Sequence, residues 1–140
     1  MALEFKVAID ARDPLTLGEF WQLALGYVRH PPPPGFDDWE SALASWGKPP
    51  SAFNDVNSII DPEGDGPPIV LQKVPESKAA KNRLHLDVNV GGQQAGRPDR
   101  VRAHVATLVA AGARVIREHD EDGTFWMVLQ DPEGNEFCVH

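Results

Sequence analysis

The tetrapeptide Asp-Pro-Glu-Gly occurs twice in this chain of 140 residues, at positions 61–64 and 131–134. Each copy precedes the last strand-like segment of its half of the sequence. Both halves show the same order of patterns, in which an alternating segment is followed by a segment with helical spacing and then by further strand-like segments. The repeat therefore predicts an internal duplication, with two βαβββ modules in one chain.

In the first half, residues 3–10 alternate apolar and polar side chains, which predicts a half-buried strand. The next helix is expected to begin at Asp13-Pro14, an N-cap followed by a first-turn proline, and to end at Gly26. Phe20 and Trp21 lie on the apolar stripe of this helix, so we expect both in the core.

Residues 31–55 are expected as an insert in the first module, because four consecutive prolines, at positions 31–34, cannot continue a regular sheet. A short helix is predicted within the insert, ending at Gly47. Trp39 and Trp46 of this segment cover the mouth of a binding site, lie at a dimer contact, or simply anchor the insert. The remaining strands of this half are predicted over 56–60 and 69–74.

The second half repeats the order. Arg97-Pro98 predicts a helix start and Gly112 its end. Asp122-Gly123 is typical of a hairpin turn between two strands. Strands are predicted over 84–90, 114–118, 124–130 and 137–140.

Charge and composition exclude several classes of partner. The formal net charge of −8 repels phosphate backbones and anionic lipid headgroups, so nucleic acid and membrane surfaces are not expected as partners. The single cysteine, Cys138, excludes an internal disulfide. The first ten residues lack a basic start and a long apolar stretch. We therefore expect a soluble, cytoplasmic protein.

Four segments together resemble the vicinal oxygen chelate superfamily, specifically its small glyoxalase-like and bleomycin-resistance-like proteins. They are DPLTLGEFWQLALGY, KNRLHLDVNV, AAGARVI and VLQDPEGNEFCVH, in this order. The resemblance covers nearly the whole chain and implies a single glyoxalase-like domain over 1–140. It implies the α+β class, with tandem βαβββ modules at about 3–75 and 83–140 whose mixed sheets form a cup, and a homodimer in many members.

Alternation predicts which side chains line the cup. In the segment LHLDVNV, Leu84, Leu86, Val88 and Val90 are expected to face the helix, which leaves His85, Asp87 and Asn89 on the opposite face. The same parity places Lys6 and Asp10 of the first strand on the cup side. It also places there Glu136, Cys138 and His140, opposite Phe137 and Val139.

The resemblance implies four metal-ligand positions, one from the first and one from the last strand of each module. These positions hold Lys6, Gln72, His85 and Cys138. Only His85 is a conventional ligand, because the ammonium of Lys6 repels a dication and Gln72 is a weak neutral donor. We therefore expect no full metal site and no cofactor. The alternative is a shifted site made of His85, Cys138, Glu136 and Asp10.

Each candidate residue has two interpretations. His85 is either a general base or a histidine satisfied by Asp87 or the backbone. Lys6 either binds an anionic group of a ligand or pairs with a carboxylate. Cys138 is expected as a packing residue rather than a nucleophile. Trp126 either stacks an aromatic ligand or fills the core.

These observations predict a small-molecule-binding protein that holds a partly aromatic compound without a full metal site. The expected ligand-binding residues are Asp10, Gln72, Asp87, Asn89, Trp126 and Cys138. The alternative is a lyase, isomerase or dioxygenase of the same superfamily, with His85 as base and Lys6 stabilising an oxyanion. A module that only pairs with another protein is the third hypothesis.

Overall fold

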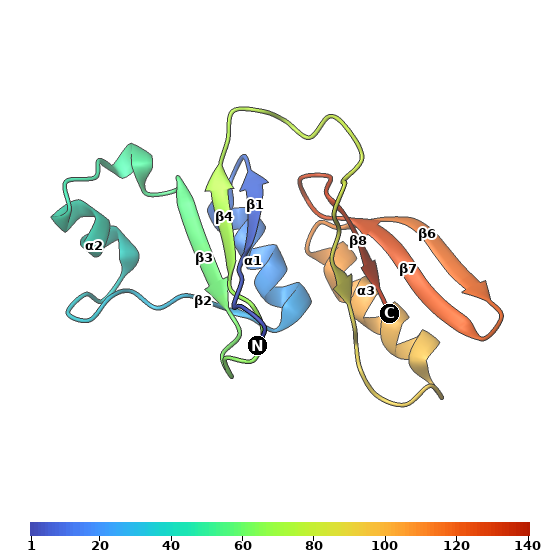
Figure 1. The fold of residues 1–140 in the computed structure, drawn as a ribbon. Coiled ribbons are helices and arrows are strands. Elements are labelled where there is room, and N and C mark those ends of the chain that lie inside the picture. The colour runs from blue at the N-terminus through green and yellow to red at the C-terminus, as the bar shows by residue number, and fades with distance from the viewer. The chain divides into compact units, whose positions relative to one another are not determined.

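Two four-stranded mixed sheets organise the chain, with strand orders β1-β4-β3-β2 and β5-β8-β7-β6. The computed structural model describes residues 1–140. It divides into a first unit of Met1–Gln22 and Gly26–Glu76 and a second unit of Leu23–Leu25 and Ser77–His140. Each sheet follows the same βαβββ connection order (Figure 1), so the predicted α+β fold class is confirmed.

In the first sheet, β1 (Val7–Ala11) pairs in parallel with β4 (Ile69–Lys73). Antiparallel pairing then joins β4 to β3 (Val56–Ile60) and β3 to β2 (Val28–Arg29). The predicted strand over 3–10 begins four residues late. Pro67 and Pro68 precede β4 and have no N–H to donate, so the ladder between β1 and β4 starts only at the bond from the Val7 N–H to the Pro68 carbonyl, 2.9 Å long.

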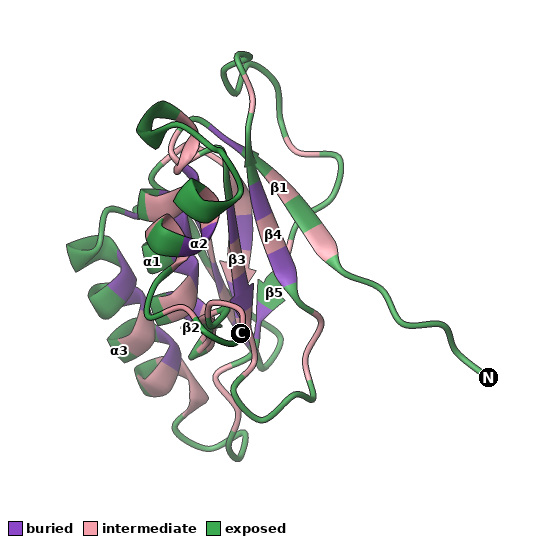
Figure 2. Ribbon diagram, turned by 90° about the vertical axis from the view of Figure 1, so that its left-hand side faces the viewer, coloured by how far each residue is buried: buried purple, intermediate pink, exposed green.

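Helix α1 (Pro14–Leu25) has the predicted ends. The Asp13 carboxylate accepts a hydrogen bond from the Thr16 N–H at 3.1 Å, and Gly26 closes the helix with φ of 72°. Phe20 and Trp21 are buried, as expected, together with Ile59 and Leu71 of the sheet. Buried positions alternate with less buried ones along β3 and β4 (Figure 2).

The insert forms α2 (Trp39–Ser45) and a short 3₁₀ turn, η1 (Pro50–Ala52). The Asp38 side chain caps α2 by accepting a hydrogen bond from the Ser41 N–H at 2.7 Å. The indole N–H of Trp39 donates to the His30 carbonyl at 2.7 Å, and Trp46 packs edge-on against Trp39. The insert therefore has its own small aromatic cluster.

In the second sheet, β5 (Asp87–Val88) pairs in parallel with β8 (Glu136–Val139). Antiparallel pairing joins β8 to β7 (Thr124–Gln130) and β7 to β6 (Arg114–Glu121). The predicted hairpin is present, with positive φ at Asp122 and Gly123. Helix α3 (Arg97–Ala110) contributes Val101, Val105 and Leu108 to a core that also holds Phe125, Met127, Leu129, Phe137 and Val139.

The predicted strand over 84–90 is shorter in the structure. Backbone bonds at its two ends run from the Cys138 N–H to the Leu86 carbonyl and from the Val90 N–H to the His140 carbonyl. Leu84 precedes the first of these bonds and is 73% exposed, so its expected core position is wrong. No helix in the structure is long and apolar enough to cross a membrane.

Candidate functional site

A polar face covers the second sheet on the side opposite its buried side chains. Along β7 and β8, buried residues alternate with half-buried ones, and the half-buried set includes Trp126, Cys138 and His140. Register across the sheet places Asp87 beside Cys138, Cys138 beside Val128, and Val128 beside Arg117. The alternation predicted for β7 and β8 is therefore confirmed, and the polar face spans all four strands.

Three aromatic rings form a row on this face. His119 of β6 is the register partner of Trp126 on β7, and their ring centroids lie 3.6 Å apart with planes inclined by 22°. On the other side of Trp126, the ring of His140 is stacked at 5.8 Å, again inclined by 22°. Both faces of the indole are therefore opposed by imidazole rings.

Asp87 connects two histidines. Its Oδ1 lies 3.3 Å from Nε2 of His85 and 3.6 Å from Nε2 of His140, and each contact is an ion pair when the imidazole is protonated. Of the two interpretations of His85, the structure thus shows the one in which Asp87 is a partner of the imidazole. Because the Asp87 carboxylate lies within reach of Nε2 of His85, the pair also has the arrangement of a base and its positioning carboxylate.

Cys138 lies beside Asp87 and is partly buried. Burial raises the pKa of its thiol, and the negative charge of Asp87 and a hydrogen bond to that carboxylate raise the pKa further. Lys81 and Arg117 oppose this shift with smaller effects. An activated nucleophile needs a lowered pKa, so the surroundings of Cys138 keep it in the unreactive thiol form.

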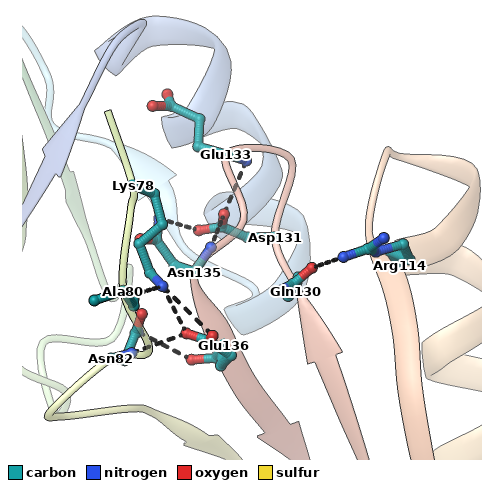
Figure 3. Close-up of polar contacts among 9 residues, drawn as sticks. All are labelled: Lys78, Ala80, Asn82, Arg114, Gln130, Asp131, Glu133, Asn135 and Glu136. Atoms are coloured by element: carbon teal, nitrogen blue, oxygen red, sulfur yellow. Dashed lines mark hydrogen bonds and ion pairs between the residues drawn. The ribbon is translucent and has the colours of Figure 1, made fainter. Parts of the chain in front are cut away.

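The Glu136 side chain is bound by residues of the segment 78–82, which belongs to the second unit (Figure 3). Its carboxylate accepts a hydrogen bond from the Asn82 N–H at 3.1 Å and forms an ion pair with Lys78 Nζ at 3.1 Å. The Asn82 bond, with Lys78, lowers the pKa of Glu136 to about 2. Lys78 also donates to the Ala80 carbonyl. Glu136 is therefore a positioning residue for this segment rather than a free ligand.

Two candidate residues of the first unit contact each other. Asp10 of β1 is the register partner of Gln72 on β4, and the Gln72 amide donates to the Asp10 carboxylate at 2.8 Å. Lys6 is exposed and precedes β1. Asn89, in the second unit, accepts a hydrogen bond from the Gly91 N–H at 2.8 Å and thereby closes a turn. Whether these residues share a cavity with His85 stays a prediction.

Comparison with known proteins defines the class. A family model described as glyoxalase-like domain matches residues 6–140, and the chain belongs to this family. Solved structures of the glyoxalase, bleomycin resistance and dioxygenase superfamily share the fold, which confirms the resemblance seen in the sequence. No protein of curated function matches the chain.

Three solved structures illustrate the likeness. A glyoxalase/bleomycin resistance protein/dioxygenase family enzyme from Burkholderia phytofirmans is 20% identical, with TM-score 0.61 over 96% of this chain and 94% of that one. A possible glyoxalase from Bacillus cereus is 14% identical, with TM-score 0.63 over 99% and 98%. A mutant fosfomycin resistance protein, FosX, from Listeria monocytogenes, complexed with Mn(II) and 1S,2S-dihydroxypropylphosphonic acid, is 11% identical, with TM-score 0.64 over 100% and 90%.

The metal-ligand positions implied by the resemblance do not fit a divalent cation. Lys6 offers an ammonium, which has no lone pair at neutral pH. Gln72 offers only a neutral amide oxygen, and the raised pKa of the Cys138 thiol opposes the thiolate form that a metal binds. A different trio lies close together, because one ligand atom each of His85, Asp87 and Cys138 fall within 4.8 Å of one another.

His119 and Arg117 were not identified from the sequence as site residues. Every residue of β6 except His119 is exposed, so the strand shows no alternation from which its two faces could be distinguished. A register shift between Val115 and Arg117 also changes the parity along β6. The signal that could have found His119 is the hairpin at Asp122-Gly123, because counting back from that turn pairs His119 with Trp126.

Proposed function

We propose that this glyoxalase-like protein binds a small organic acid with a planar apolar part on the polar face of its second sheet. The observation that carries the proposal is the row of His119, Trp126 and His140. Rings that stack on neighbouring strands turn their faces toward one another and their edges outward. An aromatic ligand lying across the row is then contacted edge to face, which is a favourable aromatic geometry.

The spacing of the row excludes a ligand ring inserted beside Trp126. A third ring between two stacked rings needs them about 7 Å apart, at about 3.5 Å per contact. The gap between Trp126 and His140 is 5.8 Å and that between His119 and Trp126 is 3.6 Å. The ligand therefore lies over the ring edges, where the N–H groups of indole and imidazole are available as donors.

The charges on the face favour an acidic group. Arg117 lies two residues from His119 on the same strand, and its positive charge offsets a small part of the rise in the pKa of Cys138. The carboxylate of Asp87 is shared between His85 and His140, and that of Glu136 is held by Lys78 and Asn82. Arginine and imidazole donors recognise carboxylates and related anions.

Calorimetric titration with 2-naphthoate and with neutral 2-naphthamide tests this proposal. We expect 2-naphthoate to bind more tightly, and Trp126→Leu to weaken its binding at least tenfold. The matched control is Trp46→Leu, which removes an exposed tryptophan of the first unit and leaves affinity unchanged. Equal affinity for the two compounds, or equal effects of the two substitutions, would overturn the proposal.

A second candidate, an isomerase, lyase or dioxygenase, is favoured by the contact between His85 and Asp87. A carboxylate 3.3 Å from Nε2 positions the imidazole, as general-base catalysis requires. Proton abstraction by His85 is tested by NMR, following deuterium uptake from D₂O at the carbon next to the carbonyl of 2-oxo acids. Uptake that His85→Ala abolishes and His104→Ala retains would favour the enzyme.

A further inference from the structure

We propose that the insert of the first unit carries a binding site for a methylated ammonium group, formed by the rings of Phe36, Trp39 and Trp46. The chemical class of its ligand is an organic cation with a trimethylammonium head, presented by a small solute or by a methylated lysine of another protein. The site belongs to the first unit, whereas the residues proposed to bind an organic acid belong to the second. The two proposals are therefore independent.

Trp46 is the central ring of this aromatic cluster. Its ring centroid lies 6.3 Å from that of Phe36 and 6.4 Å from that of Trp39, and the ring planes are inclined to the indole of Trp46 by 71° and 72°. Trp46 is also 55% exposed, so its indole is not covered on both faces. Rings that face in different directions around one exposed indole suit a compact, rounded group, whereas a flat ligand needs one flat aromatic surface.

The three rings are held in place without a ligand. The indole N–H of Trp39 donates to the His30 carbonyl at 2.7 Å, and the two rings are also in contact, with centroids 6.2 Å apart. The N–H of Phe36 donates to the Pro33 carbonyl at 3.2 Å, directly after the run of four prolines. Trp46 directly follows α2, and its backbone N–H closes that helix. Because the rings are already ordered, binding costs little conformational entropy.

The charge of the insert favours a cation. Residues 30–47 contain three acidic residues and no lysine or arginine; the acidic residues are Asp37, Asp38 and Glu40. Asp37 and Asp38 are exposed, and Glu40 lies 3.7 Å from the guanidinium of Arg29. Aromatic faces carry partial negative charge and attract cations in the same way as these carboxylates. An anionic ligand is therefore disfavoured at the insert.

Hydration selects a methylated cation over a primary ammonium. The side-chain ammonium of lysine is compact and strongly hydrated, so it stays in water. A trimethylammonium group has a shell of methyl groups, and aromatic rings can surround it. No lysine or arginine of the chain lies over the rings of the cluster, whereas Arg102 in the second unit lies 4.7 Å above the ring of Phe125. The faces of the cluster are thus available to a ligand.

Titration with choline, followed by NMR of the indole N–H groups, tests the proposal. The chain has four tryptophans, so a proton–nitrogen correlation spectrum observes each indole separately. We expect choline to shift the signals of Trp39 and Trp46 with a dissociation constant in the millimolar range, because cation contacts with exposed rings are individually weak. The neutral isostere 3,3-dimethyl-1-butanol should bind about fivefold more weakly. Sodium chloride at the same concentration should not reproduce the shifts.

Substitutions connect the binding to the cluster. Trp46→Leu should weaken choline binding about tenfold, because it removes the central ring. The matched control is Phe5→Leu, which removes an exposed ring of the same unit outside the cluster and should leave choline binding unchanged. Asp37→Asn should weaken choline binding only about twofold, since an exposed charge contributes little in water. Unshifted indole signals of Trp21 and Trp126 show that each variant is folded.

A short peptide with one trimethyllysine distinguishes the two sources of the ammonium group. Binding tighter than that of choline, and lost in the unmethylated peptide, assigns the ligand to a methylated protein, whereas binding equal to that of choline assigns it to a free solute. The proposal is overturned if choline leaves Trp39 and Trp46 unshifted, if the neutral alcohol binds as well as choline, or if Trp46→Leu and Phe5→Leu have equal effects. None of these results bears on the binding of 2-naphthoate by the second unit.

Discussion

Replacing Asp131 by alanine should destabilise the chain strongly, because this side chain organises the turn that leads into β8. Its Oδ1 accepts hydrogen bonds from the N–H groups of Glu133 at 2.9 Å and Asn135 at 3.0 Å, and its Oδ2 accepts from the Asn135 amide at 2.9 Å. Asp131 is only 3% exposed, so water cannot replace these bonds. Hydrogen bonds to a charged group contribute about 1.5–3 kcal/mol each, and they are not additive.

We therefore expect Asp131→Ala to lower the free energy of unfolding by about 3 kcal/mol and the Tm by roughly 10 °C. The matched control is Asp61→Ala in the other copy of the turn, where the carboxylate accepts from Glu63 and Gly66 but is less buried. Its loss should be about 1 kcal/mol. Urea unfolding followed by circular dichroism measures both. Equal losses for the two variants would refute the reasoning from burial.

Three further perturbations follow from named contacts. Asp87→Asn should speed iodoacetamide alkylation of Cys138 at neutral pH about fourfold, because it lowers the pKa of the thiol. Fourfold is the effect of one negative charge within 4.8 Å in a water-like dielectric. An unchanged rate would contradict the contribution of Asp87 to the raised pKa of Cys138. Because the pKa of Glu136 is lowered from 4.5 to about 2, its contacts with Lys78 and Asn82 stabilise fully above pH 4.5 and are lost as the pH falls toward 2. Pepsin cleavage around 77–83 should therefore rise over this pH range in the parent protein, and should already be high at pH 4.5 in Glu136→Gln. Gly18→Ala should lower the free energy of unfolding, measured in urea, by about 1–3 kcal/mol. The added Cβ would lie 2.2 Å from Asn57 Nδ2, so the hydrogen bond from Asn57 to the Pro14 carbonyl would be lost. An unchanged urea midpoint would show that Asn57 can move without cost.

Local signals in the sequence were sufficient for the helices and turns. Asp13, Pro14 and Gly26 act within a few residues of the helix ends that they set, and Asp122-Gly123 sets its hairpin by its own backbone conformation. Alternation also identified the polar side of β8, because one face of that strand is packed in the core.

Long-range contacts limited the prediction of the site. The pairing of Glu136 with Lys78 and Asn82 joins residues 58 and 54 positions apart, and no local pattern encodes it. The row of His119, Trp126 and His140 depends on the register of three strands. The extent of β5 depends on its pairing with β8 and His140, whose backbone hydrogen bonds reach only from Leu86 to Val90. Each of these features is a property of the assembled sheet.

The insert offers a consequence for engineering. β2 ends at Arg29 and β3 begins at Val56, and the two strands are antiparallel neighbours in which Arg29 pairs with Ile59. The intervening segment is thus an enlarged hairpin connection, closed at its base by the hydrogen bond from the His30 N–H to the Ser58 carbonyl, 2.8 Å long. Because the His30 N–H already donates to the Ser58 carbonyl, residues 31–53 can be exchanged for a shorter loop or a fluorescent reporter domain and the sheet would keep its pairing. Asn54 has to be kept, because its side chain accepts from the Leu15 N–H and donates to Asp13.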